Sequence, residues 1–242
     1  MKNHSDKLKN IASNFMTESV KTEYSYNFKW LSRPIIQYPQ DIVATQEIIW
    51  EVKPDLIIET GIAHGGSLVL SASILALLDY SDACDHGELL DPKKPSRKVI
   101  GIDIDIRKHN LQALNNHPLR NRIELIEGSS IDPKVVSKIN KASNNFNRVM
   151  VFLDSNHTHN HVLEELKAYA HLVSSGSYCV VFDTIIENLP KNSSVDRPWS
   201  VGNNPKTAVW EFLKTNPEFA IDFSIQNKLL ITVAPDGYLK RK

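Results

Sequence analysis

The sequence predicts an α/β protein with a doubly wound, mostly parallel sheet that finishes in an antiparallel C-terminal strand. Short apolar runs alternate with amphipathic segments five times along the chain, which is the pattern of repeated strand-helix units. Two further apolar segments, 219–223 and 229–233, follow one another closely and are expected to pair as antiparallel strands. We divide the chain into an N-terminal arm and strap, residues 1–41, and one α/β domain, residues 42–242.

Composition limits the classes of partner. The 242 residues are 41% hydrophobic, and 28 basic residues balance 28 acidic ones, so nothing favours nucleic acid or an anionic membrane surface. Cys84 lies in a polar segment and Cys179 in an apolar one, which predicts neither a disulfide nor a metal cluster. The N-terminus lacks the apolar core of a signal peptide, and no apolar run approaches membrane-spanning length. We therefore expect a cytoplasmic protein without membrane insertion.

The N-terminal region precedes the first predicted strand. Residues 1–25 favour a helical arm. Residues 26–41 combine aromatic side chains with two prolines, which indicates an irregular strap packed on the core. A lid that faces the substrate is the alternative interpretation of this strap. Residues 42–52 have helical periodicity, and Pro54 stops that helix.

The most informative segment is 55–70, which reads DLIIETGIAHGGSLVL. Its apolar residues predict a buried parallel strand, with Glu59 at the end, Gly61 in a turn, and a helix over 67–78. A strand, a glycine turn and a helix N-terminus together present main-chain N–H groups to a nucleotide-like ligand. The glycines do not follow G-x-G-x-x-G, and an acid at this position suits ribose hydroxyls or an ammonium group better than phosphate. The turn therefore indicates S-adenosylmethionine rather than NAD.

The rest of the chain continues the alternation. Residues 79–97 are polar and contain prolines, and their His, Cys and acidic residues show no metal-ligand spacing, so a solvated loop is predicted. We predict further strands at 98–104, 123–126, 149–153 and 177–182, helices at 107–116, 133–139, 160–173 and 206–213, and a long loop at 184–204.

Acidic residues end four of the predicted strands: Glu59, Asp103, Asp154 and Asp183. Each alone could cap a helix or a turn. Together they meet at the carboxyl edge of the sheet, where ligands bind in this class of fold. Asp103 ends the second strand, the usual position of a carboxylate that holds ribose hydroxyls. Ser129 follows the third strand, where it could meet an adenine edge.

The segment LDSNHTHNHV places Asp154 beside three histidines. Asp154 and Asp183 end adjacent strands of the predicted sheet, and oxygen ligands of this kind suit Mg²⁺. The spacing of His157, His159 and His161 does not put all three on one helical face, so zinc is the less favoured alternative. His157 is the candidate general base, with a structural histidine at a helix start as the alternative. The other two histidines are expected to be structural.

Three blocks of the chain carry a family likeness: QEIIWEVKPDLIIETGIAHGGS, LDSNHTHNHVLEELKAYAHLVSSGSYCVVFDT and RPWSVGNNPKTAVWEFL. In combination they resemble the cephalosporin hydroxylase family, which is related to rhamnosyl and other sugar O-methyltransferases. The resemblance implies a Rossmann-like Class I methyltransferase fold that binds S-adenosylmethionine, with Asp154 and Asp183 at a divalent metal. With the strand-end residues above, the predicted cofactor set is Glu59, Thr60, Gly61, His64, Gly65, Ser67, Asp103 and Ser129.

One position departs from the family pattern. In the antibiotic-pathway branch the fifth strand ends in Glu-Asp and both acids bind the metal, whereas this chain has Phe182-Asp183. A phenylalanine cannot coordinate an ion. Asp183 with Thr184 resembles the Asp-Asn pair of catechol O-methyltransferase, where a neutral oxygen completes the site. Thr184 is therefore predicted as the third metal ligand.

The predicted reaction is methyl transfer from S-adenosylmethionine to a sugar hydroxyl of a glycan or glycosylated metabolite. Mg²⁺ or a similar divalent cation would assist, with Asp154 and His157 as catalytic residues. The acceptor is expected to be covered by Trp30, Arg33, Arg197 and Trp199. Besides a small-molecule or glycan acceptor, a second copy of the chain is a candidate partner. Two alternatives stay open: a hydroxylase or other oxidoreductase, as the family name suggests, and a non-catalytic module that binds the cofactor.

Overall fold

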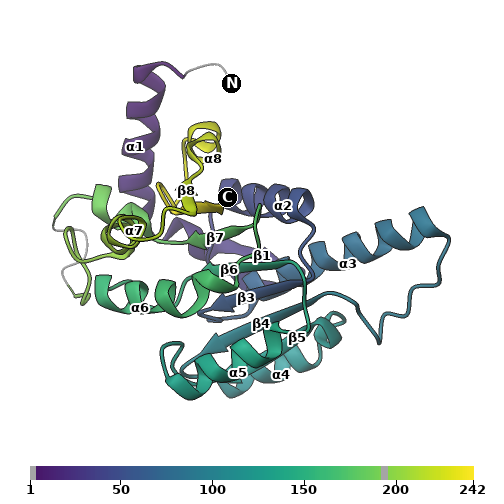
Figure 1. Cartoon of the computed structure of the whole chain (residues 1–242). Helices are drawn as coiled ribbons and strands as arrows, with labels where there is room; N and C mark the ends of the chain where they lie inside the picture. The colour runs from purple at the N-terminus through teal and green to yellow at the C-terminus, as the bar shows by residue number, and fades with distance from the viewer. Residues whose placement is uncertain (1–3, 192–195) are drawn as a thin grey trace.

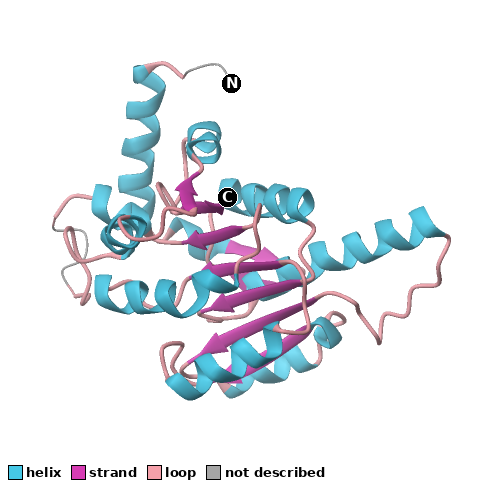
Figure 2. Cartoon of the chain, viewed as in Figure 1, coloured by secondary structure: helices cyan, strands magenta, loops and turns pink. Residues whose placement is uncertain are grey.

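A computed structural model describes residues 4–191 and 196–242, and its core is a seven-stranded sheet (Figures 1 and 2). The first three residues of the predicted arm and residues 192–195 of the predicted loop lie outside this range. The strand order is β5-β4-β3-β6-β7-β9-β8. Neighbours from β5 to β7 run parallel, and β9 runs antiparallel to both β7 and β8. The strands are β3 (Leu56–Thr60), β4 (Lys98–Asp103), β5 (Ile123–Glu127), β6 (Val149–Leu153), β7 (Tyr178–Val181), β8 (Phe219–Ile221) and β9 (Tyr238–Arg241).

Helices cover both faces of the sheet. The apolar core on one face joins β3 residues such as Ile57 to α2 and α3, and the core on the other face joins Leu56 and Ile58 to α5, α6 and α7. This alternation follows from the period of two along a strand that is buried on both sides. The helices are α1 (Asp6–Lys21), α2 (Pro39–Val52), α3 (Gly66–His86), α4 (Lys108–Asn115), α5 (Pro133–Ser143), α6 (His159–Tyr169), α7 (Pro205–Leu213) and α8 (Phe223–Leu229). The predicted doubly wound fold with an antiparallel C-terminal strand is confirmed.

Local sequence accounts for several helix starts. Pro133 and Pro205 open α5 and α7, where a missing N–H costs nothing. Asp132 caps α5 by accepting from the Lys134 N–H, as the Asp-Pro pair suggests. Asn204 caps α7 in a capping box with Thr207.

The helix predicted over 67–78 is longer than expected. It continues to His86 and ends at Gly87 in the left-handed conformation, so the first part of the predicted loop 79–97 is helical. Asp79 made this stretch look solvent-exposed, but the side chain is buried and pairs with Arg97 and Arg122. Burial alone would raise the pKa of Asp79, yet hydrogen bonds from Ser96 and the two arginines lower it below its usual value. These partners come from later in the chain, so periodicity could not reveal them.

The length of α3 also changes one expectation about apolar segments. By length and composition, α3 is long and apolar enough to cross a membrane, with a mean hydropathy of 1.3 over its most apolar 18 residues. Half of that window is buried inside the structure. Its buried residues, which include Leu68, Leu75 and Leu78, belong to the core between the helix and the sheet. Core packing therefore accounts for its apolar character.

The C-terminal strand pair was placed partly wrongly. β8 lies where the first strand was predicted, but residues 223–229 form α8, and the strand predicted at 229–233 is absent from the described structure. The second strand is β9, whose Tyr238 and Leu239 are buried. Asp222 caps α8 by accepting from the Ser224 N–H, a local signal that outweighs the apolar pattern. Lys240 and Arg241 make β9 look like a polar tail.

The strap is more regular than predicted. β1 (Phe28–Trp30) and β2 (Arg33–Ile35) form a small hairpin that lies on α3. The turn residues Leu31 and Ser32 both have positive φ, as this hairpin turn requires. Leucine and serine do not predict that conformation, so the turn was not recognised in the sequence. Trp30 donates its indole N–H to the Ser73 hydroxyl of α3 at 3.0 Å.

Gly66 is required where this hairpin meets α3. A Cβ at Gly66 would lie 2.6 Å from the Ile35 Cβ and would also collide with the Pro34 carbonyl. In an unobstructed helix, a change from glycine to alanine stabilises by about 1 kcal/mol. Here the clash dominates, so we expect Gly66→Ala to lower the free energy of unfolding by about 1–3 kcal/mol in urea titrations. A gain in stability would contradict the described contact.

Candidate cofactor and metal site

A cavity of about 530 Å³ lies at the carboxyl ends of the central parallel strands. On one side it is lined by the turn after β3, from Gly61 to His64, together with Ser67 and Asp103. On the other side lie the strand-end residues Asp154 and Asp183 with His157. The predicted cofactor residues of the turn (the cofactor half) and the predicted metal residues at the strand ends (the metal half) therefore border one cavity.

Gly61 joins the two halves. Its φ is +86°, and a Cβ there would lie 2.6 Å from the Asp154 carbonyl carbon and closer still to its oxygen. The turn after β3 consequently runs directly against the backbone at the end of β6. The Asp154 N–H completes this contact by donating to the Thr60 carbonyl at 3.0 Å.

Asp103 shapes the turn. Its Oδ2 accepts from the N–H groups of Ile62 (2.8 Å) and Ala63 (3.2 Å), and its Oδ1 accepts from Asp105 at 3.1 Å. Ala63 has a φ of +45°, a strained value for a residue with a side chain. The two hydrogen bonds to Asp103 fix this conformation beside the cavity.

Arg33 holds the same turn from outside. Its guanidinium donates to the His64 carbonyl (3.0 Å from Nε) and to Asn110 Oδ1 (2.8 Å), and Asn110 donates to the Ala63 carbonyl at 2.9 Å. The hairpin and α4 are thereby tied to the turn. Arg33 and Trp30 were predicted to cover the acceptor. Instead, they dock the hairpin, because the turn and α3 offer them hydrogen-bond acceptors.

Glu59 lies beneath the turn and is buried. Ser67 donates to one carboxylate oxygen, and the other oxygen, Oε2, has no hydrogen-bond partner among the described residues. Burial raises the pKa of Glu59 to about 8, and the Ser67 hydrogen bond acts in the opposite direction. Glu59 does not line the cavity, but it shares a small pocket with Ser67 and Asp154, which do. An unpaired buried oxygen there fits a ligand that carries N–H donors, as the amino-acid end of S-adenosylmethionine does.

Four residues of the predicted cofactor set lie outside the cavity lining. Glu59 and Thr60 are buried, Gly65 packs against Leu114, and Ser129 follows β5 without lining the cavity. Gly61, His64, Ser67 and Asp103 do line it. The cofactor roles of all eight residues stay predictions.

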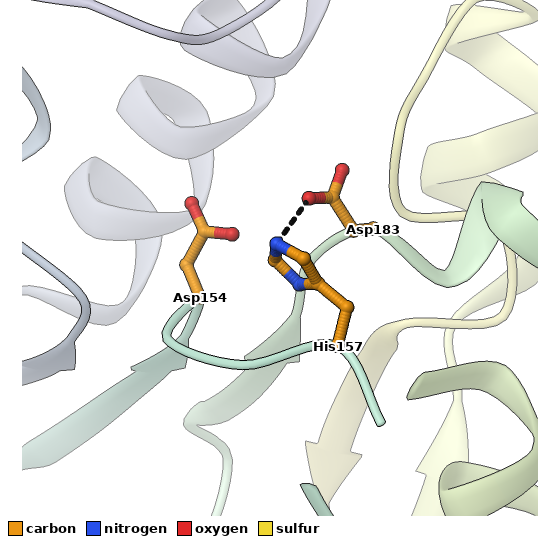
Figure 3. A group of neighbouring side chains, drawn as sticks. All are labelled: Asp154, His157 and Asp183. Carbon is orange, nitrogen blue, oxygen red and sulfur yellow. Dashed lines mark ion pairs between the residues drawn. The ribbon is translucent and has the colours of Figure 1, made fainter. Parts of the chain in front are cut away.

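Asp154, His157 and Asp183 form a compact group (Figure 3). Each offers one ligand atom, and these atoms lie within 4.8 Å of one another. Asp154 follows β6 and Asp183 follows the neighbouring β7, as predicted from the order of strands. His157 Nε2 lies 3.1 Å from Asp183 Oδ2. Asp183 has a φ of +55°, which aspartate tolerates better than most residues.

The charge around this group suits a divalent cation. Burial raises the pKa of Asp154 well above its usual value, and the nearby carboxylates of Asp183, Glu59 and Glu165 raise it further. Such a cluster is stabilised by a bound cation. Carboxylates suit Mg²⁺, and a set with one histidine also suits softer metals. The donor set therefore fits the predicted metal.

Thr184 is not brought into this group. Its side chain is fully buried, and its hydroxyl donates to the Pro235 carbonyl at 2.6 Å. Phe182 packs edge to face on Phe152, with ring centres 6.0 Å apart, and so belongs to the core. The structure instead places His157 beside the two aspartates.

Aromatic and cationic side chains of the loop after β7 lie over His157. The Trp199 ring meets the imidazole edge to face at 4.7 Å, and the Arg197 guanidinium lies 5.4 Å from the Trp199 ring centre. Both residues line the cavity, and their place near an acceptor stays a prediction. His159 instead bonds Thr207, and His161 lies against Ser130 and Ser155, which are structural positions.

Two polar residues that support the site were not predicted from the sequence. Asn110 on α4 supports the turn, and Gln37 of the strap donates to Asp154 Oδ2 at 3.3 Å. Both contacts join residues that are far apart in the chain. A single sequence carries no signal for them.

The raised pKa of Glu59 has a consequence for stability. Because this pKa is about 8 in the folded protein and 4.5 without the fold, the folded state binds more protons, and stability falls as pH rises between these values. We expect Glu59→Gln to remove this loss. The free energy of unfolding of the variant should therefore rise relative to that of the wild type by several kcal/mol from about pH 5 to pH 8, since each pKa unit corresponds to about 1.4 kcal/mol. Urea unfolding in EDTA measures the difference. A gap that stays constant with pH would contradict the assignment.

Comparisons with known proteins agree with this architecture. Residues 22–242 match the family model described as Rhamnosyl O-methyltransferase/CmcI. A rhamnosyl O-methyltransferase of Mycobacterium tuberculosis is 31% identical over 199 residues, which span 81% of this chain and 71% of that protein. The Mycobacterium leprae enzyme of the same name is 27% identical over 237 residues, 93% of this chain and 92% of that protein.

Solved structures show the same fold. A structure of CmcI with Mg and S-adenosylmethionine has a TM-score of 0.54 and 19% identity, and the match covers 90% of this chain and 77% of that one. The apo structure of CalS11, a TDP-rhamnose 3'-O-methyltransferase, has a TM-score of 0.55 and 14% identity, with 98% and 96% of the two chains covered. On the family match and the mycobacterial relatives, this chain belongs to the Rhamnosyl O-methyltransferase/CmcI family.

Proposed function

We propose that this protein is an S-adenosylmethionine-dependent O-methyltransferase that methylates a sugar hydroxyl of a glycan or glycosylated metabolite with the help of Mg²⁺ or a similar cation. One observation carries the proposal: a single cavity borders both the glycine turn after β3 and the Asp154, His157 and Asp183 group. Methyl donor and acceptor must meet in one space for direct transfer. The names of the mycobacterial relatives support the sugar and the reaction.

Separate residues of the chain would bind the methyl donor and the cation. The turn shaped by Asp103 would hold the adenosine end of the donor, and Glu59 would accept hydrogen bonds from its amino-acid end. Asp154 and Asp183 would hold the cation at the acceptor hydroxyls. When bound, the donor supplies a methyl group on a positively charged sulfur, and the cation supplies charge that favours loss of the hydroxyl proton.

His157 would accept that proton. The acceptor oxygen forms a bond to the methyl carbon while the carbon–sulfur bond breaks, and the products are a methyl ether, S-adenosylhomocysteine and a proton on the imidazole. Asp183 lies 3.1 Å from His157 Nε2, so its carboxylate can stabilise the protonated ring. Trp199 packs edge to face on this ring and would help to exclude water from it.

Part of the cavity lining suits a sugar. It includes Tyr26 and Trp199, whose ring faces can stack on a sugar, and Lys21 and Arg197, whose groups donate hydrogen bonds to hydroxyls. Residues 34–38 of the strap also line the cavity. This placement supports the substrate-facing alternative for the strap.

Calorimetry tests the two halves of the site separately. We expect the wild type to bind S-adenosylmethionine at sub-millimolar concentration and to methylate a sugar acceptor when Mg²⁺ is present. Asp154→Ala should abolish turnover and leave the affinity for S-adenosylmethionine nearly unchanged, because Asp154 belongs to the metal half. Asp85→Ala, which changes an exposed acid of α3, is the control and should retain both properties. Absence of cofactor binding by the wild type would refute the proposal, and equal loss of turnover and affinity would move Asp154 to the cofactor half.

His157→Gln tests the general base. The amide keeps a polar group near Asp183 but accepts no proton at neutral pH, so we expect kcat to fall by about 10²–10⁴-fold. A loss of less than tenfold in kcat would assign His157 a positioning role only.

A further inference from the structure

Gln37 is a buried residue of the strap whose side-chain amide reaches the Asp154, His157 and Asp183 group. It lies between β2 and α2, and the side chain is 6% exposed. Its Nε2 donates to Asp154 Oδ2 at 3.3 Å. Its Oε1 has no hydrogen-bond partner in the part of the chain that the structure describes. Gln37 lines the same cavity as Asp154, His157 and Asp183.

The neighbours of Gln37 hold it in place. Ile35 and Tyr38 are 2% and 1% exposed, and the Tyr38 hydroxyl is hydrogen-bonded to Ser19 of α1 at 2.8 Å. The backbone of the strap is therefore anchored on both sides of Gln37. An amide held in this way is preorganised for a contact in the cavity.

The distance between the two side chains is that of neighbouring metal ligands. Mg²⁺ binds oxygen at about 2.0–2.1 Å in octahedral geometry, so adjacent ligand atoms lie about 3 Å apart. The Gln37 amide lies at 3.3 Å from Asp154 Oδ2. A half-turn about its last side-chain bond exchanges the N–H₂ group and the oxygen without moving the rest of the residue. Without a cation the N–H faces the carboxylate, and with a cation the oxygen can take that place.

We propose that Gln37 supplies the neutral oxygen ligand of the metal site, beside the carboxylates of Asp154 and Asp183. This role rests on the proposed function, because it presumes that the group binds a divalent cation. Thr184 cannot take the role while its hydroxyl is bound to the Pro235 carbonyl. Two aspartates balance the charge of a divalent cation, and an amide adds an oxygen without adding charge. His157 then stays available to accept the proton of the acceptor.

Calorimetric titration of the full-length, metal-free protein with MgCl₂ tests this role without any activity assay. Gln37→Met keeps the size of the side chain and removes the oxygen, so we expect the affinity for Mg²⁺ to fall about 10–100-fold. Gln37→Glu restores an oxygen with added charge and should bind Mg²⁺ at least as tightly as the wild type. Gln40→Met is the matched control, since Gln40 also has an unpaired Oε1 but lies outside the cavity lining. Its affinity should match that of the wild type.

The outcomes separate this inference from the proposed function. Wild-type affinity for Mg²⁺ in Gln37→Met would overturn the role of Gln37 and leave the metal site intact. A wild type that binds S-adenosylmethionine but no Mg²⁺ would overturn the metal site and this ligand, and would leave a metal-independent methyltransferase. A wild type that binds Mg²⁺ but no S-adenosylmethionine would refute the proposed function. The Mg²⁺ titration of Gln37→Met would then still decide whether Gln37 is a metal ligand. If Gln37→Met fails to fold, Gln37→Glu decides, because a loss of more than tenfold there would overturn the role.

Discussion

The site depends on the contact between the turn after β3 and the backbone at the end of β6. β3 is flanked by β4 on one side and β6 on the other, and the chain turns outward in opposite directions from this point. Ligands bind at such points because the loops diverge and leave a crevice. Gly61 allows the turn to lie against Asp154, so the predicted cofactor half and metal half share one wall. Any side chain at position 61 would drive them apart.

The N-terminal segment is part of this arrangement. Arg33 and Asn110 hold the carbonyls of the turn, Gly66 lets the hairpin lie on the first turn of α3, and Gln37 reaches Asp154. The strap, with its hairpin and Gln37, thus contacts both halves of the site. Its position relative to α3 sets the shape of the turn and the wall of the cavity together. A strap that merely covered the core would make none of these contacts.

The fold was largely predictable from the sequence because its elements are local. A buried strand such as Leu56–Thr60 shows as an apolar run, and the Asp132-Pro133 pair marks a helix start without reference to the rest of the chain. The errors arose where distant residues decide. The pairing of Asp79 with arginines extends α3, and β9 is a strand only because it inserts between β7 and β8.

The same division applies to the site. Strand ends carry Asp103, Asp154 and Asp183, so strand order was enough to group them. Gln37 was missed and Thr184 was misplaced, because neighbouring positions in the chain say nothing about the direction of a side chain. Thr184 follows Asp183 directly yet faces Pro235, whereas Gln37 lies 117 residues from Asp154 and contacts it.

Hydrogen bonding separates the structural acids of this region from those that fit a ligand. Burial raises the pKa of Asp41 to about 6, but Asp41 accepts from the hydroxyls of Thr232 and Tyr238 and from the Val233 N–H. Both of its carboxylate oxygens have hydrogen-bond donors, so Asp41 fixes the C-terminal loop to α2 and offers no unpaired oxygen to a ligand. In the same region Glu59 is buried and Asp154 is half-buried, and each receives one side-chain hydrogen bond within the described chain. A buried carboxylate with so few donors is unfavourable unless a proton or a cation joins it. The under-satisfied acids are therefore those beside the cavity, where a cofactor amine and a divalent cation would complete them.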